Sequence, residues 1–303
     1  MDLPELRLLH YFIAVAEELH FGRAAARLHV TQPGLSQQIQ SLERRLGVRL
    51  LERTSRQVRL TPAGGLLLNE SRRLLAETER AVDRVRRTGR GEMGRVTVAA
   101  IGSATYEVVP RLLRAHRLRF PDVELVLREM STPAQVQALR NGEIDVGLLR
   151  VPADTTGLVE HTLREDRMAL MLPETHPLAR RRRIPLRALA REPLILFPAA
   201  PRPSWADTVV AACREAGFEP IVAQEAMESA TVVSFVAAGV GIAIVPEGLE
   251  VLARVGVAYR LVAPPAPVTR LAAVHRDGQL APAVAGLTAL VRELWRGGEA
   301  VKR

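Results

Sequence analysis

Four polar side chains recur along residues 32–46 with the spacing of one helix face. They are Gln32, Ser36, Gln37 and Gln40, and the complementary apolar positions are Leu35, Ile39, Leu42 and Leu46. A glutamine side chain carries a donor and an acceptor together, which is the pair that reads adenine in the DNA major groove, and a serine can serve as either. The pattern predicts an amphipathic helix that presents amides to base edges.

The elements around this helix complete the outline of a winged helix-turn-helix over residues 1–60. Apolar spacing predicts helices over 6–16 and 23–28, a turn at His29-Val30, and an N-cap at Thr31 with Pro33 in the first turn. After Gly47, residues 48–51 and 57–60 read as two strands of a hairpin wing, with Arg53 and Arg56 at its tip, where they can contact phosphate. The alternative is a small helical packing module with exposed glutamines.

The charge distribution favours a surface that faces phosphates. The chain has 303 residues, a net charge of +9 and one cysteine, so a disulfide framework is excluded. Residues 19–60 hold eight arginines and only two acidic residues, Glu43 and Glu52. A basic surplus concentrated in a small unit is typical of nucleic-acid binding, although an arginine-rich composition with solvated faces is the alternative.

Residues 21–39, FGRAAARLHVTQPGLSQQI, carry a resemblance to a known family. Together with Leu42-Glu43, Leu46-Gly47 and LERT at 51–54, they resemble the N-terminal domain of LysR-type transcriptional regulators. The resemblance implies double-stranded promoter DNA as a partner, and RNA polymerase as a second one. We expect Gln32, Pro33, Ser36 and Gln37 to meet base edges, with Gln40 on the same DNA-binding face, and Thr31, Arg53 and Arg56 to contact phosphates. Two glycines depart from the usual pattern: Gly22 replaces a hydroxyl cap, and Gly34 lies inside the helix.

Residues 61–90 predict one long connecting helix and a hinge. Thr61-Pro62 can start the helix, and apolar side chains recur at sevens, as at Leu67, Leu74 and Ala81, with charges between them. A helix this long cannot bury a narrow apolar stripe on itself, so it packs on its own domain or pairs with a second chain. The resemblance implies pairing, and therefore a homodimer or homotetramer. Residues 89–94 then form the hinge.

From residue 95 onward, apolar strands alternate with helices. This pattern predicts a parallel sheet covered on both faces. The expected strands are 96–101, 123–127, 144–149, 168–172, 194–197, 221–223, 242–245 and 271–275, and the expected helices are 108–118, 134–139, 186–190, 206–216, 231–238 and 281–295.

Several loops that follow these strands carry groups suited to binding an anion. Ser103 follows the first strand, Thr132 the second, Arg150 closes the third, and Trp205 offers an apolar wall after a later strand. Ligands bind outside the carboxyl ends of strands in such sheets, and hydroxyls, helix N–H groups and a guanidinium suit a small carboxylate. The alternatives are helix caps for the serine and threonine, a structural ion pair for Arg150, and a rigid turn for the proline-rich loop.

The C-terminal residues also resemble the LysR family. The runs FPDV at 120–123, GEIDVG at 142–147, HPL at 176–178 and VAAGVGIAIVP at 236–246 are similar to its effector domain. The resemblance implies a domain over 91–303 with two lobes like those of periplasmic binding proteins, lobe I at about 91–165 and 269–303 and lobe II at about 166–268. The segments around Ser103, Thr132 and 197–205 resemble most the branch that controls aromatic-compound degradation, whose effectors include muconate. That branch implies effector contacts at Ser103, Thr132, Pro203 and Trp205, and a second, inner site at Arg164.

The remaining patterns argue against an enzyme and a metal site. No Walker loop, dinucleotide fingerprint or nucleophile elbow occurs, the seven histidines lack metal-ligand spacing, and Cys213 lies among alanines like a buried filler. No signal peptide or membrane helix is convincing, so we expect a cytoplasmic protein without a cofactor. The leading hypothesis is a regulator that senses a small organic acid. The alternative is a small-molecule-binding protein or enzyme whose N-terminal unit mainly serves dimerisation.

Overall fold

The computed structural model describes residues 5–53, 57–200, 202, 204–252, 254–266 and 268–296. The chain divides into two compact units, Met1–Arg86 and Arg87–Arg303. The first unit contains α1 (Leu6–Glu18), α2 (Phe21–Leu28), α3 (Gln32–Leu46), β1 (Leu51–Arg53), β2 (Val58–Leu60) and most of α4 (Pro62–Gly89). The sequence therefore predicted the helices of this unit correctly, with ends shifted by a few residues.

The core of the first unit is built by α1, α2, α3 and the start of the wing. Its buried side chains include Phe12, Ala24, Leu35, Ile39 and Leu42, and Leu67 and Leu68 of α4 pack against it. The helix starts are capped as the spacing required: the His20 side chain accepts from the Arg23 N–H, and the Thr31 hydroxyl accepts from the Gly34 N–H.

The predicted wing is wrong in one strand. The first strand lies at Leu51–Arg53, not at 48–51, and it pairs antiparallel with β2. The Glu43 carboxylate of α3 accepts from the Leu50 and Leu51 N–H groups at 2.9 and 3.1 Å. The backbone before β1 is thus held to α3, which moves the hairpin toward the C-terminus and puts Arg53 inside a strand instead of at the tip.

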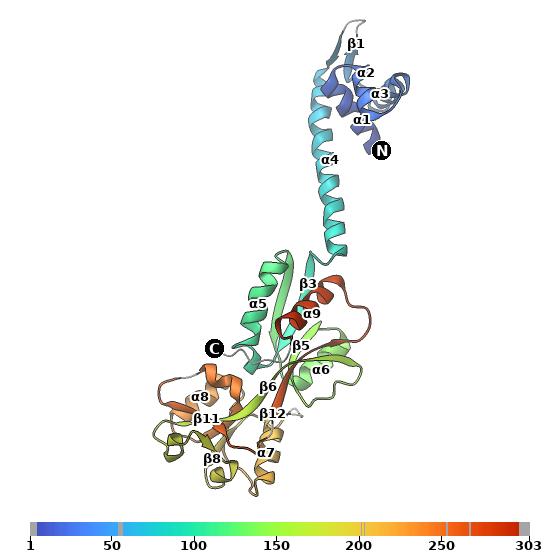
Figure 1. The fold of residues 1–303 in the computed structure, drawn as a ribbon. Coiled ribbons are helices and arrows are strands. Elements are labelled where there is room, and N and C mark those ends of the chain that lie inside the picture. Colours follow the sequence, from blue (N-terminus) through green and yellow to red (C-terminus); the bar gives the residue numbers. More distant parts are fainter. Residues whose placement is uncertain are drawn as a thin grey trace. The chain divides into compact units, whose positions relative to one another are not determined.

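Helix α4 buries only its beginning. Gly64 and Ser71 are its buried residues, whereas Leu74, Val82 and Val85 are exposed. Figure 1 shows α4 as one continuous helix. The predicted apolar stripe is therefore present and uncovered over the second half of the helix within this chain.

The second unit is a two-lobed α/β structure built on one mixed sheet. Its strands are β3 (Gly94–Ala100), β4 (Val123–Glu129), β5 (Val146–Val151), β6 (Leu158–Pro173), β7 (Arg183–Ile184), β8 (Pro193–Leu196), β9 (Ile221–Glu225), β10 (Ile242–Pro246), β11 (Val257–Val262) and β12 (Val268–Arg276). Its helices are α5 (Val108–Arg119), α6 (Thr132–Asn141), α7 (Trp205–Glu215), α8 (Ser229–Ala237) and α9 (Pro282–Leu294), with short 3₁₀ helices at Gly102–Ala104, Pro177–Arg180, Leu186–Leu189 and Glu247–Leu252.

The prediction of a parallel sheet is correct only in part. The strand order is β4-β3-β5-β12-β6-β10-β8-β9, and β12 and β6 run antiparallel to their neighbours. Strand β6 passes from one lobe to the other, since its residues up to Arg167 pair with β12 and those from Met168 pair with β10 and β11 (Figure 1). Its first half was missed because charged residues interrupt the apolar pattern there.

Both faces of each lobe are covered, as expected. In the first lobe, α5 and α9 pack on one face, around Leu112 and Leu287, and α6 packs on the other through Leu139. In the second lobe, α7 and α8 contribute Val209 and Val236 to separate core clusters. Cys213 is buried on α7, and burial raises the pKa of its thiol to about 11, so it is the inert filler that the sequence suggested.

Two neighbouring glycines of α4 test its packing against the wing. A Cβ on Gly64 would lie 2.0 Å from the Leu50 carbonyl oxygen, whereas one on Gly65 would meet nothing within 4 Å. We therefore expect Gly65→Ala to raise the free energy of unfolding by about 0.5–1 kcal/mol. Gly64→Ala should lower it by about 1–3 kcal/mol, because the backbone must shift. Thermal unfolding of the full chain measures both, and equal stabilisation by the two changes would contradict this packing.

Candidate functional site

Helix α3 presents a polar face above a buried apolar face. Leu35, Ile39 and Leu42 are at most 1% exposed. On the opposite side, the exposed residues are Gln32, Pro33, Gln37 and Gln40, and Ser36 is half-buried. The two faces predicted from the sequence are thus arranged as a major-groove reading helix needs. Base contacts by these side chains remain a prediction.

Arg53 has a structural contact set that the sequence did not reveal. Its guanidinium donates to the Glu43 carboxylate at 3.0 Å and to the Ser36 hydroxyl at 3.4 Å, and it lies 4.8 Å from the centre of the Phe21 ring. Because Glu43 also holds the backbone before β1, Arg53 links the wing to α2 and α3. Its role on phosphate remains a prediction, and the other predicted wing contact, Arg56, lies outside the described residues.

The second candidate site is a cavity of about 900 Å³ between the two lobes. It is lined by the ends of β3, β4 and β5 and by the starts of α6, α7 and α8. Ser103, Thr132, Arg150 and Trp205 all line it, so the structure brings together four of the predicted effector residues. Pro203 lies outside the described residues.

Arg150 is the cationic residue of this lining. Its Nη2 atom donates to Asp166 Oδ2 at 2.8 Å and to the Ser103 hydroxyl at 3.3 Å. Its backbone N–H donates to the Thr132 hydroxyl at 3.3 Å, and its guanidinium lies 5.8 Å from the centre of the Trp205 ring. Arg150 is therefore a structural ion pair and part of the cavity wall at once. Burial lowers its pKa, and Asp166 opposes that effect.

Two guanidinium nitrogens of Arg150 have no protein partner. Nε and Nη1 are buried and donate to no acceptor among the described residues. A buried donor without a partner is costly, so a group in the cavity that accepts from these nitrogens would be stabilised there. With the Ser103 and Thr132 hydroxyls beside it, this corner of the cavity can hold a carboxylate.

Arg164 does not line the cavity. Its guanidinium pairs with Asp166 Oδ1 at 2.9 Å and with the carboxylate of Glu107, and it passes beside Gly248, where a Cβ would lie 1.9 Å from its Nη2 atom. The sequence assigned Arg164 to effector binding through an inner site. The structure instead gives it a buried network that it shares with Arg150 through Asp166, and the inner site remains a prediction.

Sequence reasoning missed Asp166 and four acidic residues of the cavity lining. Asp166 is 4% exposed and holds both arginines. The acidic lining residues are Glu129, Asp207, Glu215 and Glu228. Glu129 directly follows a predicted strand, so its position at the carboxyl edge of the sheet was a usable signal. Asp166 lies in the part of β6 that was not predicted.

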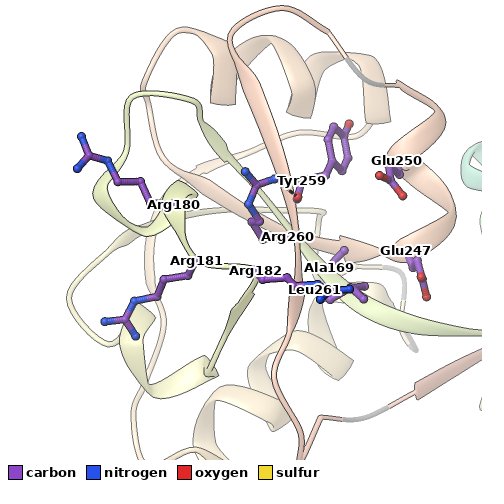
Figure 2. A pocket seen from close by; sticks show the side chains of 9 residues that line it. All are labelled: Ala169, Arg180, Arg181, Arg182, Glu247, Glu250, Tyr259, Arg260 and Leu261. Atoms are coloured by element: carbon purple, nitrogen blue, oxygen red, sulfur yellow. Dashed lines mark hydrogen bonds between the residues drawn. The ribbon is translucent and has the colours of Figure 1, made fainter.

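A smaller hollow of about 440 Å³ lies on the second lobe, between the 3₁₀ segment near Arg180 and strand β11. Figure 2 shows Arg180 and Arg181 directed away from Glu247, Glu250 and Tyr259. The Arg260 guanidinium donates to the Ala179 and Tyr259 carbonyl oxygens. The cationic groups of this hollow therefore do not converge on one point, and the interlobe cavity is the better site for an anion.

Neither a metal centre nor a membrane span is found in the part of the chain that the structure describes. No group of three or more histidine, cysteine, aspartate and glutamate side chains is arranged to hold a metal ion there. None of the described helices is both long and apolar enough to cross a membrane.

Comparisons with known proteins identify the family of both units. The family model described as "Bacterial regulatory helix-turn-helix protein, lysR family" matches residues 6–65, and "LysR substrate binding domain" matches residues 89–296. The chain is 43% identical to the transcriptional regulator AlsR of Bacillus subtilis over 84% of this chain and 85% of AlsR. It is 37% identical to the transcriptional regulator CatR of Pseudomonas putida over 95% and 99% of the two chains.

A solved structure extends the likeness to three dimensions. The crystal structure of full-length CbnR with its target DNA superposes with a TM-score of 0.85 at 32% identity, and covers 96% of this chain and 99% of that one. The two family models together span most of the sequence, and the relatives are named transcriptional regulators. The chain therefore belongs to the LysR family and is a DNA-binding transcriptional regulator, not an enzyme.

Proposed function

We propose that this regulator reads promoter DNA with the exposed face of α3 and senses a small organic acid in the interlobe cavity. The observation that carries the DNA half is the exposure of the α3 amides above Leu35, Ile39 and Leu42 in the core. Gln32, Pro33, Ser36, Gln37 and Gln40 would meet base edges, and Thr31 and Arg56 phosphates. Arg53 would hold the wing in place and reach phosphate only from there.

The effector half rests on Arg150 and its surroundings. The carboxylate of the acid would accept from the free nitrogens of Arg150 and from the hydroxyls of Ser103 and Thr132, and its apolar part would lie on Trp205. An intermediate of aromatic degradation is one such acid, in line with the resemblance of these segments to that branch. Arg164 would act through Asp166, which it shares with Arg150.

The uncovered stripe of α4 supports a homodimer, with a homotetramer as the larger assembly. Leu74, Val82 and Val85 repeat at helical spacing and are exposed in the single chain. Residues 1–60 would then be the DNA-binding domain, 61–90 the dimerisation helix and hinge, and 91–303 the effector domain. A bacterial regulator of this kind acts in the cytoplasm, where it would also meet RNA polymerase.

Sensing needs a difference in affinity between two arrangements of the protein. An acid that binds one arrangement of the lobes more tightly shifts the population toward it. The same coupling, acting through α4, would change how the paired DNA-binding units hold their sites and so alter transcription of nearby genes.

Replacement of Gln32 tests base reading. We expect Gln32→Ala to cost about 1–3 kcal/mol of discrimination at one base pair, because the amide's paired donor and acceptor are lost. Electrophoretic mobility shifts with an intergenic fragment beside the gene, and with random DNA, measure this loss. Gln279→Ala removes an exposed amide in the other unit and should change neither affinity. Equal losses on both DNAs for Gln32→Ala would contradict base reading, and no preference for the fragment would contradict the regulator's proposed target.

Replacement of Thr132 tests the effector site. Thr132→Val keeps the side-chain volume but removes the hydroxyl that the Arg150 N–H donates to and that an acid could accept from. We expect DNA binding without effector to be unchanged. The effector concentration at half-maximal response should rise by about ten- to a hundredfold, since one hydrogen bond to a charged group is worth about 1.5–3 kcal/mol. An unchanged midpoint would show that the acid binds elsewhere.

Charges on the stripe of α4 test dimerisation. The double change Leu74→Glu and Val82→Glu removes two apolar side chains whose burial is worth about 1.5–3 kcal/mol each. We expect the dissociation constant of the dimer to rise by at least about a hundredfold, since about 1.4 kcal/mol corresponds to a factor of ten. Analytical ultracentrifugation measures this constant. Ala76→Glu, exposed but off the stripe, is the control and should leave the mass unchanged. An unchanged mass for the double variant would place the interface elsewhere.

A further inference from the structure

We propose that the effector is a zwitterion, with one carboxylate and one cationic group, and that the interlobe cavity disfavours dicarboxylates. This inference rests on the proposed role of the cavity as the effector site. It narrows the class of acid by the charges of the lining.

The lining carries too many carboxylates to favour a ligand with two negative charges. Among its described residues Arg150 is the one cation, and it already pairs with Asp166 at 2.8 Å. Asp207 is engaged by the Ser204 N–H at 2.8 Å and by Arg202 at 3.4 Å. The carboxylates of Glu129, Glu215 and Glu228 have no ion pair among the described residues. A second carboxylate on the ligand would therefore face like charges with no cation left to meet it.

Two of these free carboxylates line the cavity from opposite lobes. Glu129 ends β4, and its Oε1 atom lies 2.8 Å from the place of a Cβ on Gly102, so the side chain lies over the start of the 3₁₀ turn that carries Ser103. Glu228 is the residue before α8. Both residues line the cavity, Glu129 from the first lobe and Glu228 from the second.

Glu129 and Arg150 reach the cavity from different strands. The strand order β4-β3-β5 separates Glu129 on β4 from Arg150 on β5 by two strand spacings, or roughly 10 Å of backbone. Trp205 and Phe197 supply apolar surface to the same lining. A ligand with a carboxylate toward Arg150, an apolar middle, and a cation toward Glu129 and Glu228 would satisfy the two unpartnered nitrogens and the two free carboxylates at once. Its cation would also contact both lobes.

Three matched probes test the charge class. Benzoate, 4-(aminomethyl)benzoate and terephthalate share a ring and one carboxylate, and differ at the para position by hydrogen, an ammonium group or a second carboxylate. Isothermal titration calorimetry on the full chain should show 4-(aminomethyl)benzoate binding about tenfold more tightly than benzoate, and terephthalate at least about tenfold more weakly, as charge pairs and like charges require. The inference is overturned if terephthalate binds as tightly as the amino acid, or if none of the three binds.

A double variant attributes the preference to the two carboxylates. Glu129→Gln with Glu228→Gln keeps the side-chain shape and removes both charges, so the advantage of the amino acid should fall to within about twofold of benzoate and terephthalate should gain. Glu250→Gln makes the same chemical change in the smaller hollow and should leave all three affinities unchanged. Preferences that survive the double variant would overturn the assignment to these residues.

A DNA readout separates this inference from the proposed function. A probe that binds is added to the protein on its intergenic fragment, and the footprint is compared with and without it. If terephthalate binds and changes the footprint, the cavity senses an acid but the charge class proposed here is wrong. If the amino acid binds with the predicted preference and the footprint does not change, the charge class holds and the sensing role fails.

Discussion

Two buried arginines share one buried carboxylate where the two lobes meet, and the geometry of the cavity depends on that interaction. Asp166 pairs with Arg150 through one oxygen and with Arg164 through the other. It lies on β6 one residue before Arg167, after which the partners of the strand change from β12 to β10 and β11. Buried charges are costly unless they are paired, so this network fixes the Arg150 guanidinium at the cavity wall. The three side chains come from the first-lobe parts of β5 and β6, and Gly248 of the second lobe lies beside Arg164.

The parts of the fold that could be predicted are those whose signal is local. Helix α3 was found because its apolar and polar positions alternate at helical spacing, and Leu35, Ile39 and Leu42 are buried as that pattern predicts. The fourth apolar position, Leu46 at the end of the helix, is exposed. The first half of β6 and the whole of β11 were not found. Charged residues interrupt the alternation in β6, and Arg164 and Asp166 are buried there because each neutralises the other. Prediction from one element at a time expects such charged residues to be exposed, because it does not reveal the oppositely charged partner that makes their burial possible.

In the candidate sites too, some features could be predicted from the sequence and others depend on tertiary partners. Ser103, Thr132, Arg150 and Trp205 converge because the carboxyl ends of neighbouring strands open on one edge of a sheet, which is a rule of topology that needs no contact list. Their partners could not be foreseen. Arg53 illustrates this: its place in the sequence suggested a wing tip, but Glu43, ten residues away, holds both the guanidinium and the backbone before β1. Such tertiary partners decide whether a long cationic side chain extends into solvent or packs against its own protein.

The pairing of Arg150 with Asp166 is compatible with ligand binding because a guanidinium is a fork with several donors. Nη2 is committed to Asp166 and Ser103, and Nε and Nη1 remain without acceptors inside the protein. Asp166 fixes the orientation of the fork and lowers its net charge, so the remaining donors attract one acceptor group by geometry more than by excess charge. A site of this kind selects its ligand by the direction in which the acceptor group must approach Arg150 and by the other residues that line the cavity. Glu129 and Glu228 line the same cavity, so in our proposal these carboxylates select the other end of the ligand.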